Sequence, residues 1–206
     1  MEVPKNRVWW CPAGPFAFLP IHAAGIYNNE EEMECISDYC ISSYSSTLQD
    51  LLVPPAPVQP FFKLLAVIQP ELHGDPKLSL PGTVEELQKI ENHLPQPHDR
   101  YLTKLGPGDT TASVKGVLSQ LPSTSFAHFG CHALQNDFQP LESALLLEDG
   151  NLKMSDIFGC HMPNALLAYL SACETARGDW ENPDEAMHIT ATMIFAGFRG
   201  AVGTLW

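Results

Sequence analysis

The chain has 206 residues, of which 45% are hydrophobic and 9% aromatic, enough apolar material for one substantial core, so a wholly disordered chain is excluded. Its 11 Lys and Arg stand against 24 Asp and Glu, a formal net charge of -13, and this acidic balance argues against nucleic acid as a partner. The longest uncharged run, 8–27, holds three prolines and two glycines that would break a helix, so we expect neither a signal peptide nor a membrane span.

The cysteines indicate the compartment. The chain has six of them, without the short, regular spacing of a disulfide framework. Because no secretory signal is expected, we predict reduced thiols and a cytoplasmic protein.

The first third of the chain combines short apolar runs with turns. Arg7–Cys11 predicts a strand, which a Pro-Ala-Gly-Pro turn separates from a second short strand at 16–19. The run 21–27 is ambiguous between helix and strand. The acidic stretch 28–34 predicts a surface loop, and 53–60, with four prolines, predicts an extended connector.

The middle of the chain alternates strands with helices. The apolar run Phe61–Ile68 predicts a strand buried on both faces. Apolar residues at spacings of three and four predict amphipathic helices over Gly82–Leu94 and Thr110–Leu121. The second helix leads to a predicted strand over Ser125–Gly130.

The last third continues this alternation. Ala144–Leu147 and Leu152–Met154 flank an Asp-Gly pair, which predicts a hairpin whose turn residues have positive φ. We expect a strand over Ala165–Leu170, a helix over Asp184–Ala196 and a final strand over Ala201–Leu205. The whole pattern predicts an α/β fold, with a mostly parallel sheet, helices on both faces, and active-site loops at the carboxyl ends of the strands.

Two reactive residues follow two of these strands. His132 comes just after the strand at 125–130, and Cys173 just after the strand at 165–170. Adjacent parallel strands lie about 5 Å apart, so residues at the ends of two neighbours can reach one substrate carbonyl. A free thiol with a pKa of about 8.5 is only a few per cent thiolate at neutral pH and needs a nearby base. The positions therefore indicate a Cys–His pair, with the backbone N–H groups of Ala133 and Cys173 as oxyanion donors.

Other His and Cys residues lie near this pair, but their spacing is not that of a zinc site at both ends. His128 falls inside a predicted strand, where a structural role is expected. Alternation along the strand would direct Cys131 away from His128 and His132. We therefore predict no metal site.

Several segments together resemble the CHAT domain, a branch of the caspase and separase fold that occurs in many tetratricopeptide-repeat proteins. They are FAHFGCHA (126–133), SALLLEDGNLKMSDI (143–157), LAYLSACETARGD (167–179) and DEAMHITATMIFAGFRGAVGTLW (184–206). RVWWCPAGPFAFLPIHAAG and LSLPGTVEELQKIENHLP resemble the opening segment and the first long helix of that domain. The resemblance implies one CHAT domain over 1–206, truncated at the C-terminus, because family members usually continue beyond this point.

The resemblance also implies a function. It predicts a caspase-like three-layer α/β sandwich and a cysteine endopeptidase that cuts protein or peptide substrates without a cofactor, with His132 and Cys173 as its catalytic residues. Ala133 stands where the family usually has Gly. Repeat domains or a regulatory partner outside this chain are expected. The alternative is a catalytically weak CHAT module that acts in interaction or signalling as an effector or scaffold.

Four acidic residues follow the expected nucleophile within twelve positions, namely Glu174, Asp179, Asp184 and Glu185. A pocket lined by these carboxylates would favour Arg or Lys before the cleaved bond over Asp. The alternative for the same residues is that they cap the N-terminus of the helix that follows.

Overall fold

The computed structural model describes residues 5–14, 16, 19–27, 33–45, 47–48, 51–52, 62–106, 108, 110–136, 138–171 and 189–203. The described residues belong to two compact units, one up to residue 52 and the other from residue 62 onward. The predicted connector at 53–60 lies outside the described residues, as do residues 17 and 18 of the predicted strand at 16–19. The other two residues of that prediction do not form a strand, because the N–H of Leu19 donates to the carbonyl of Phe16 in a turn.

The first unit contains two pairs of short strands. β1 (Asn6–Trp10) pairs in parallel with β4 (Cys40–Tyr44), and β2 (Gly25–Tyr27) pairs antiparallel with β3 (Met33–Cys35). The helix α1 (Ile36–Tyr39) separates β3 from β4. The strand predicted at 7–11 is thus confirmed. The loop predicted at 28–34 is wrong at its end, because Glu34 pairs with Ile26 across the β2–β3 ladder.

The second unit is built on a parallel sheet of five strands, in the order β12-β11-β7-β5-β6. Four of them confirm predicted strands, and the short β6 was not predicted. Their bounds are β5 (Leu64–Ile68), β6 (Leu102–Leu105), β7 (Phe126–Gly130), β11 (Leu167–Leu170) and β12 (Gly200–Gly203).

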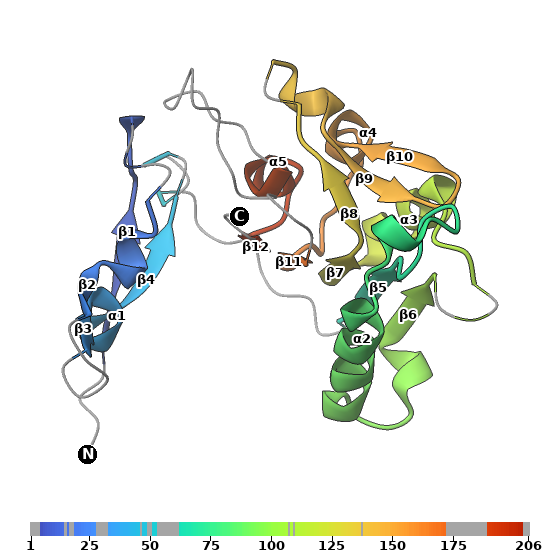
Figure 1. Ribbon diagram of the computed structural model, residues 1–206, viewed down its shortest axis with the longest axis horizontal. Coiled ribbons are helices and arrows are strands. Elements are labelled where there is room, and N and C mark those ends of the chain that lie inside the picture. The colour runs from blue at the N-terminus through green and yellow to red at the C-terminus, as the bar shows by residue number, and fades with distance from the viewer. Residues whose placement is uncertain are drawn as a thin grey trace. The chain divides into compact units, whose positions relative to one another are not determined.

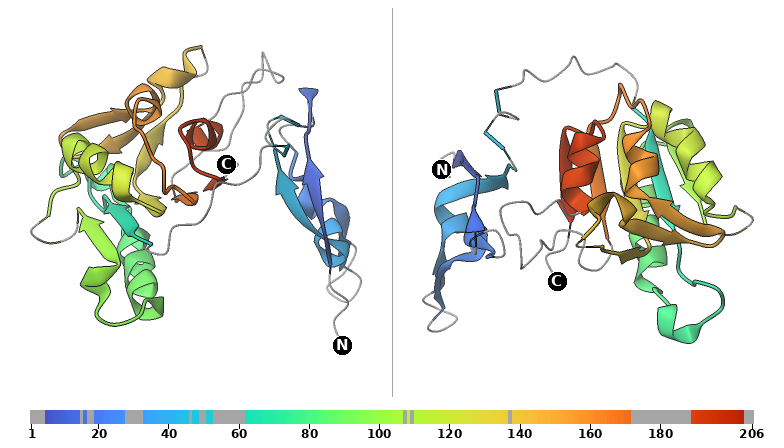
Figure 2. Two further views of the ribbon diagram at one scale, coloured as in Figure 1. Left: turned by 180° about the vertical axis from the view of Figure 1, so that it is seen from behind. Right: turned by 90° about the horizontal axis from the view of Figure 1, so that it is seen from above.

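Helices cover both faces of this sheet, as Figures 1 and 2 show. One face carries α3 (Val114–Gln120), α4 (Met154–Phe158) and α5 (Ile189–Phe195), and the other carries α2 (Gly82–His93). Alternate strand residues enter the two layers, since Phe129 is buried in the larger cluster while its strand neighbour His128 faces α2. The fold is the predicted α/β sandwich of three layers.

The predicted helices differ from the observed ones at their ends. α2 ends at His93, close to the predicted boundary. α3 begins at Val114 rather than at Thr110, because the side chain of Ser113 accepts the N–H of Gly116 and caps the helix there. For the helix predicted at 184–196, the described part is α5, and 184–188 lie outside the described residues.

A smaller antiparallel sheet follows β7. It consists of β8 (His132–Leu134), β9 (Ala144–Leu147) and β10 (Gly150–Lys153), in the order β10-β9-β8. The hairpin predicted between β9 and β10 is confirmed, but its turn differs. Gly150 has φ 150° whereas Asp149 does not adopt positive φ. Instead, the Asp149 carboxylate accepts the N–H of Val114 at 2.8 Å, at the start of α3.

Short 3-10 helices lie between the strands and helices within each unit. Their bounds are Ile21–Ala23, Pro76–Leu78, His98–Arg100, Leu121–Ser123 and Pro140–Glu142. Across the part of the chain that the structure describes, every helix is too short or too polar to cross a membrane.

Candidate active site

The strands that carry the two predicted catalytic motifs are neighbours. β7 and β11 pair in parallel, with Phe129 opposite Leu170, and the N–H of Ser171 donates to the carbonyl of Phe129 at 2.9 Å. Both strands therefore end at the same edge of the sheet, here called the carboxyl edge. His132 stands three positions after Phe129, and Cys173 stands three positions after Leu170. The expectation that the two motifs leave adjacent strand ends is confirmed.

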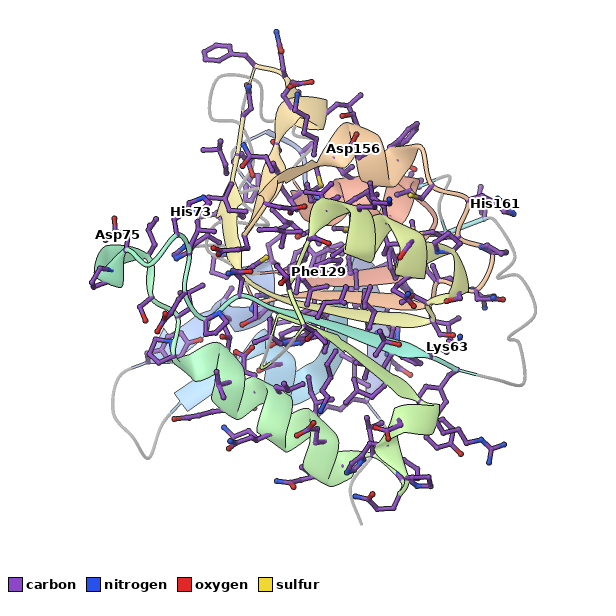
Figure 3. All side chains as sticks on the ribbon, turned by 90° about the vertical axis from the view of Figure 1, so that its right-hand side faces the viewer. Lys63, His73, Asp75, Phe129, Asp156 and His161 are labelled. Atoms are coloured by element: carbon purple, nitrogen blue, oxygen red, sulfur yellow. The ribbon has the colours of Figure 1, made fainter. Side chains whose placement is uncertain are left out.

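The direction of the strands is visible in Figure 3. Lys63, which precedes β5, lies at one end of the sheet, and His73 and Asp75, which follow β5, lie at the other. The segment after β5 thus extends from the carboxyl edge. It includes the 3-10 helix Pro76–Leu78, which contributes a contact to the expected catalytic histidine.

His132 is half-buried, and its Nε2 lies 3.1 Å from the backbone carbonyl of Leu78. A carbonyl oxygen only accepts hydrogen bonds, so Nε2 carries the proton in the neutral ring and Nδ1 holds the basic lone pair. The Leu78 carbonyl thus fixes both the tautomer and the orientation of the imidazole.

Ala133, one of the two predicted oxyanion donors, lies in β8 opposite Leu145 of β9. The residue before it, His132, is opposite Leu146 in the same ladder. Pairing with β9 therefore fixes the backbone that carries both His132 and Ala133.

The other predicted site residues, Cys173 and the acidic set Glu174, Asp179, Asp184 and Glu185, lie outside the described residues. Ser171 is the last described residue before them. The sequence distance from Ser171 to Cys173 is two positions.

Cys131 differs sharply from a reactive thiol. It is fully buried in the main core with Phe129, and burial raises the pKa of its thiol to about 12. Burial and the nearby Asp156 carboxylate also raise the pKa of Cys160. The five cysteines in the described ranges form no disulfide, and no three His, Cys, Asp or Glu side chains there gather as metal ligands.

A carboxylate network lies under the carboxyl edge, on the α2 face of the sheet. Oε2 of Glu86 lies 3.0 Å from Nε2 of His128, and Oε1 of Glu86 accepts the hydroxyl of Ser171 at 2.7 Å. The His128 ring stacks on Tyr169, with ring centroids 5.2 Å apart and planes inclined by 11°. Burial lowers the pKa of His128, and Glu86 opposes part of this shift.

Sequence reasoning expected a structural His128, and its burial and hydrogen bond agree with that role. It missed Leu78 and Glu86. Glu86 is half-buried on the side of α2 that faces the sheet, but an acidic residue beside the apolar positions of a helix gives no signal of its partner in the sheet.

A cavity of about 290 Å³ lies beside the ends of β5 and β6. Its lining includes the carboxylates of Glu71 and Glu148, together with Gln69, whose amide donates to Glu148 at 3.0 Å. The carboxyl edge therefore carries negative charge within the described residues.

Comparison with known protein families matches residues 2–206 to the family described as CHAT domain. No curated protein matches the chain.

Proposed function

The chain belongs to the CHAT domain family, and from this membership we propose that it is a cysteine peptidase, with Cys173 as nucleophile and His132 as general base. The family is related to caspase-like peptidases. The observation that carries the proposal is the pairing of β7 with β11, which brings the ends of the two motif-bearing strands together at the carboxyl edge.

The orientation of His132 supports the chemistry. In the proposed reaction, Nδ1 of His132 takes the proton of the Cys173 thiol, and the thiolate sulfur attacks the carbonyl carbon of the peptide bond. The N–H groups of Ala133 and Cys173 stabilise the oxyanion. The imidazolium then protonates the leaving amine as the C–N bond breaks, and a thioester remains on Cys173. A water molecule, deprotonated by His132, hydrolyses the thioester and restores the free thiol.

Charge at the carboxyl edge supports a basic substrate. Glu71 and Glu148 line the cavity there, and four further acidic residues follow Cys173 in the sequence. A partly desolvated carboxylate pairs better with Arg or Lys than with another acid. We therefore propose protein or peptide substrates with a basic residue before the cleaved bond.

The test is hydrolysis of a peptide library by the full chain, compared with three variants. Cys173→Ala should abolish cleavage, and His132→Ala should lower kcat/KM about 1,000-fold, within the range of general-base contributions. His161→Ala is the matched control, because His161 is exposed and should leave cleavage unchanged.

The same assays can contradict the peptidase proposal. If the wild-type chain cleaves nothing and an electrophilic peptide labels Cys173 no faster than an exposed cysteine, the peptidase proposal fails. A catalytically weak interaction module, with repeat domains or a regulatory partner outside the chain, would then be the better reading.

A further inference from the structure

One carboxylate on α2 holds two strands of the sheet from the same side. Glu86 accepts the Ser171 hydroxyl through one oxygen and contacts Nε2 of His128 through the other. Ser171 follows β11, and His128 lies in β7. The network thus connects the strand that precedes Cys173 with the strand that precedes His132.

We propose that Glu86 is a positioning residue for the nucleophile, which it orients by anchoring Ser171 two positions before Cys173. The inference rests on the proposed role of Cys173. Glu86 acts through Ser171 and not on the reacting atoms.

Two hydrogen bonds of different origin hold Ser171. Its N–H donates to the carbonyl of Phe129 in β7 at 2.9 Å, and its hydroxyl donates to Glu86 at 2.7 Å. The first bond continues the parallel ladder past the last paired residues, and the second ties the same residue to α2. A hydroxyl bonded to a carboxylate at this distance is a charge-assisted bond, which is stronger than one between neutral groups. Together, the two bonds fix the position of Ser171.

His128 fixes the other end of the carboxylate. The His128 side chain is 11% exposed, and its ring is held against Tyr169 in the neighbouring strand. Because a carboxylate only accepts, the neutral ring carries its proton on Nε2 and donates to Glu86. With both oxygens engaged by donors from two strands, the carboxylate has one orientation, and Ser171 receives its acceptor at a fixed place.

The consequence for catalysis is geometric. A misplacement of about 1 Å at a reacting group can cost about 100-fold in rate. Loss of the Ser171 anchor should therefore lower kcat more than it changes KM, because the substrate-binding surface stays intact while the sulfur is less often in line with the carbonyl carbon.

The same helix offers a control for this idea. Glu91 of α2 also bonds to the sheet, through Lys104 of β6 at 2.8 Å, but β6 is an edge strand separated from β11 by β5 and β7. Loss of Glu91 removes another carboxylate contact between α2 and the sheet without affecting Ser171.

The experiment measures kcat, KM and the melting temperature of the full chain as wild type, Ser171→Ala, Ser171→Thr, Glu86→Ala, Glu91→Ala and the double variant Ser171→Ala with Glu86→Ala. It also measures the alkylation rate of Cys173 against pH by peptide mapping. We expect Ser171→Ala to lower kcat about tenfold, with KM within twofold, as loss of a bond to a charged acceptor would. Ser171→Thr, which keeps the hydroxyl, should restore kcat. The double variant should be no slower than the slower single variant, since both changes break one link.

Several results would overturn the inference. If the wild type is active, and both Ser171→Ala and Glu86→Ala keep kcat and the Cys173 alkylation rate within twofold of the wild-type values, the inference is refuted. An equal loss in Glu91→Ala would refute it as well, because it would indicate general weakening of the α2–sheet packing. If the wild type cleaves no peptide, the proposed function fails, and the alkylation profiles still decide the inference: a profile changed in Ser171→Ala and restored in Ser171→Thr supports it, and an unchanged one refutes it.

Discussion

Replacing Cys131 by alanine tests which of two cysteines is needed for activity: Cys131, which follows β7, or Cys173, which follows β11. Cys131 is fully buried beside Phe129, and its pKa is raised from 9.0 to about 12. Because burial disfavours the charged thiolate, Cys131 holds far less thiolate at neutral pH than an ordinary thiol does. We therefore expect Cys131 to take no part in catalysis.

The energetic cost of this change follows from the packing. Cys131→Ala removes one sulfur atom from a site with 0% exposure, a change similar in size to the loss of one buried methyl group. Such a change costs about 0.5 to 1.5 kcal/mol, partly as lost transfer energy and partly as a cavity. For a chain of this length, it corresponds to a melting temperature lower by roughly 1 to 6 °C. The variant should fold and keep nearly full activity, whereas Cys173→Ala should fold and lose activity.

The assay combines peptide hydrolysis with alkylation of the native protein, followed by peptide mapping. The exposed Cys11 serves as the internal reference for an accessible thiol. Alkylation of native Cys131 within tenfold of the Cys11 rate would refute the reasoning from burial. Equal loss of activity in Cys131→Ala and Cys173→Ala would instead indicate a shared metal site or a packing defect.

Three further predictions concern pH, backbone and substrate. Burial lowers the pKa of His128 below 6.5, so the unfolded chain takes up a proton more readily than the native one. The free energy of unfolding should therefore fall as pH drops below 6.5 and through the lowered native pKa. When the free energy from urea unfolding is plotted against pH, its slope should be shallower for His128→Gln and steeper for Glu86→Gln, which removes the charge that raises this pKa. Gly106→Ala should cost about 2 to 4 kcal/mol in thermal or urea unfolding, because Gly106 has φ 110° and an added Cβ would lie 1.7 Å from the carbonyl oxygen of Ile68; Gly108→Ala, at φ 67° in open space, should cost only about 1 kcal/mol, and equal costs would contradict the clash. Peptides that differ only in the residue before the cut should be cleaved faster with Arg or Lys than with Asp, and cleavage after Asp or indifference to charge would exclude the acidic pocket.

The sheet could be predicted largely from the sequence because its strands are local apolar runs. The run that ends at Ile68 is buried in the sheet, and such runs mark strands covered on both faces. In the run that ends at Leu170, Ala168 and Leu170 are buried while Tyr169 between them is exposed. β6 escaped prediction because it is only four residues long and contains Lys104. It forms because β5 offers it a ladder of backbone partners, and Lys104 reaches Glu91 on α2.

The hairpin between β9 and β10 shows a limit of turn rules. The Asp-Gly pair predicted its location, since few residues other than Gly tolerate positive φ. Asp149 itself does not adopt positive φ, and its carboxylate accepts the N–H of Val114 at the start of α3, across 35 positions of sequence. The turn signal identified where the chain reverses, but neither the backbone angles of Asp149 nor this distant partner.

By itself, the sequence determined which residue types stand at the ends of which strands, because hydrophobic periodicity and turn residues act over a few positions. His132 and Cys173 were placed after two strands in this way, and the pairing of β7 with β11 agrees. Only the tertiary structure decided the partners of the side chains. The carbonyl of Leu78 reaches His132 across 54 positions, and Glu86 reaches Ser171 across 85. Such contacts depend on where loops and helices return to the sheet, and a local sequence pattern does not encode which distant residue will arrive there.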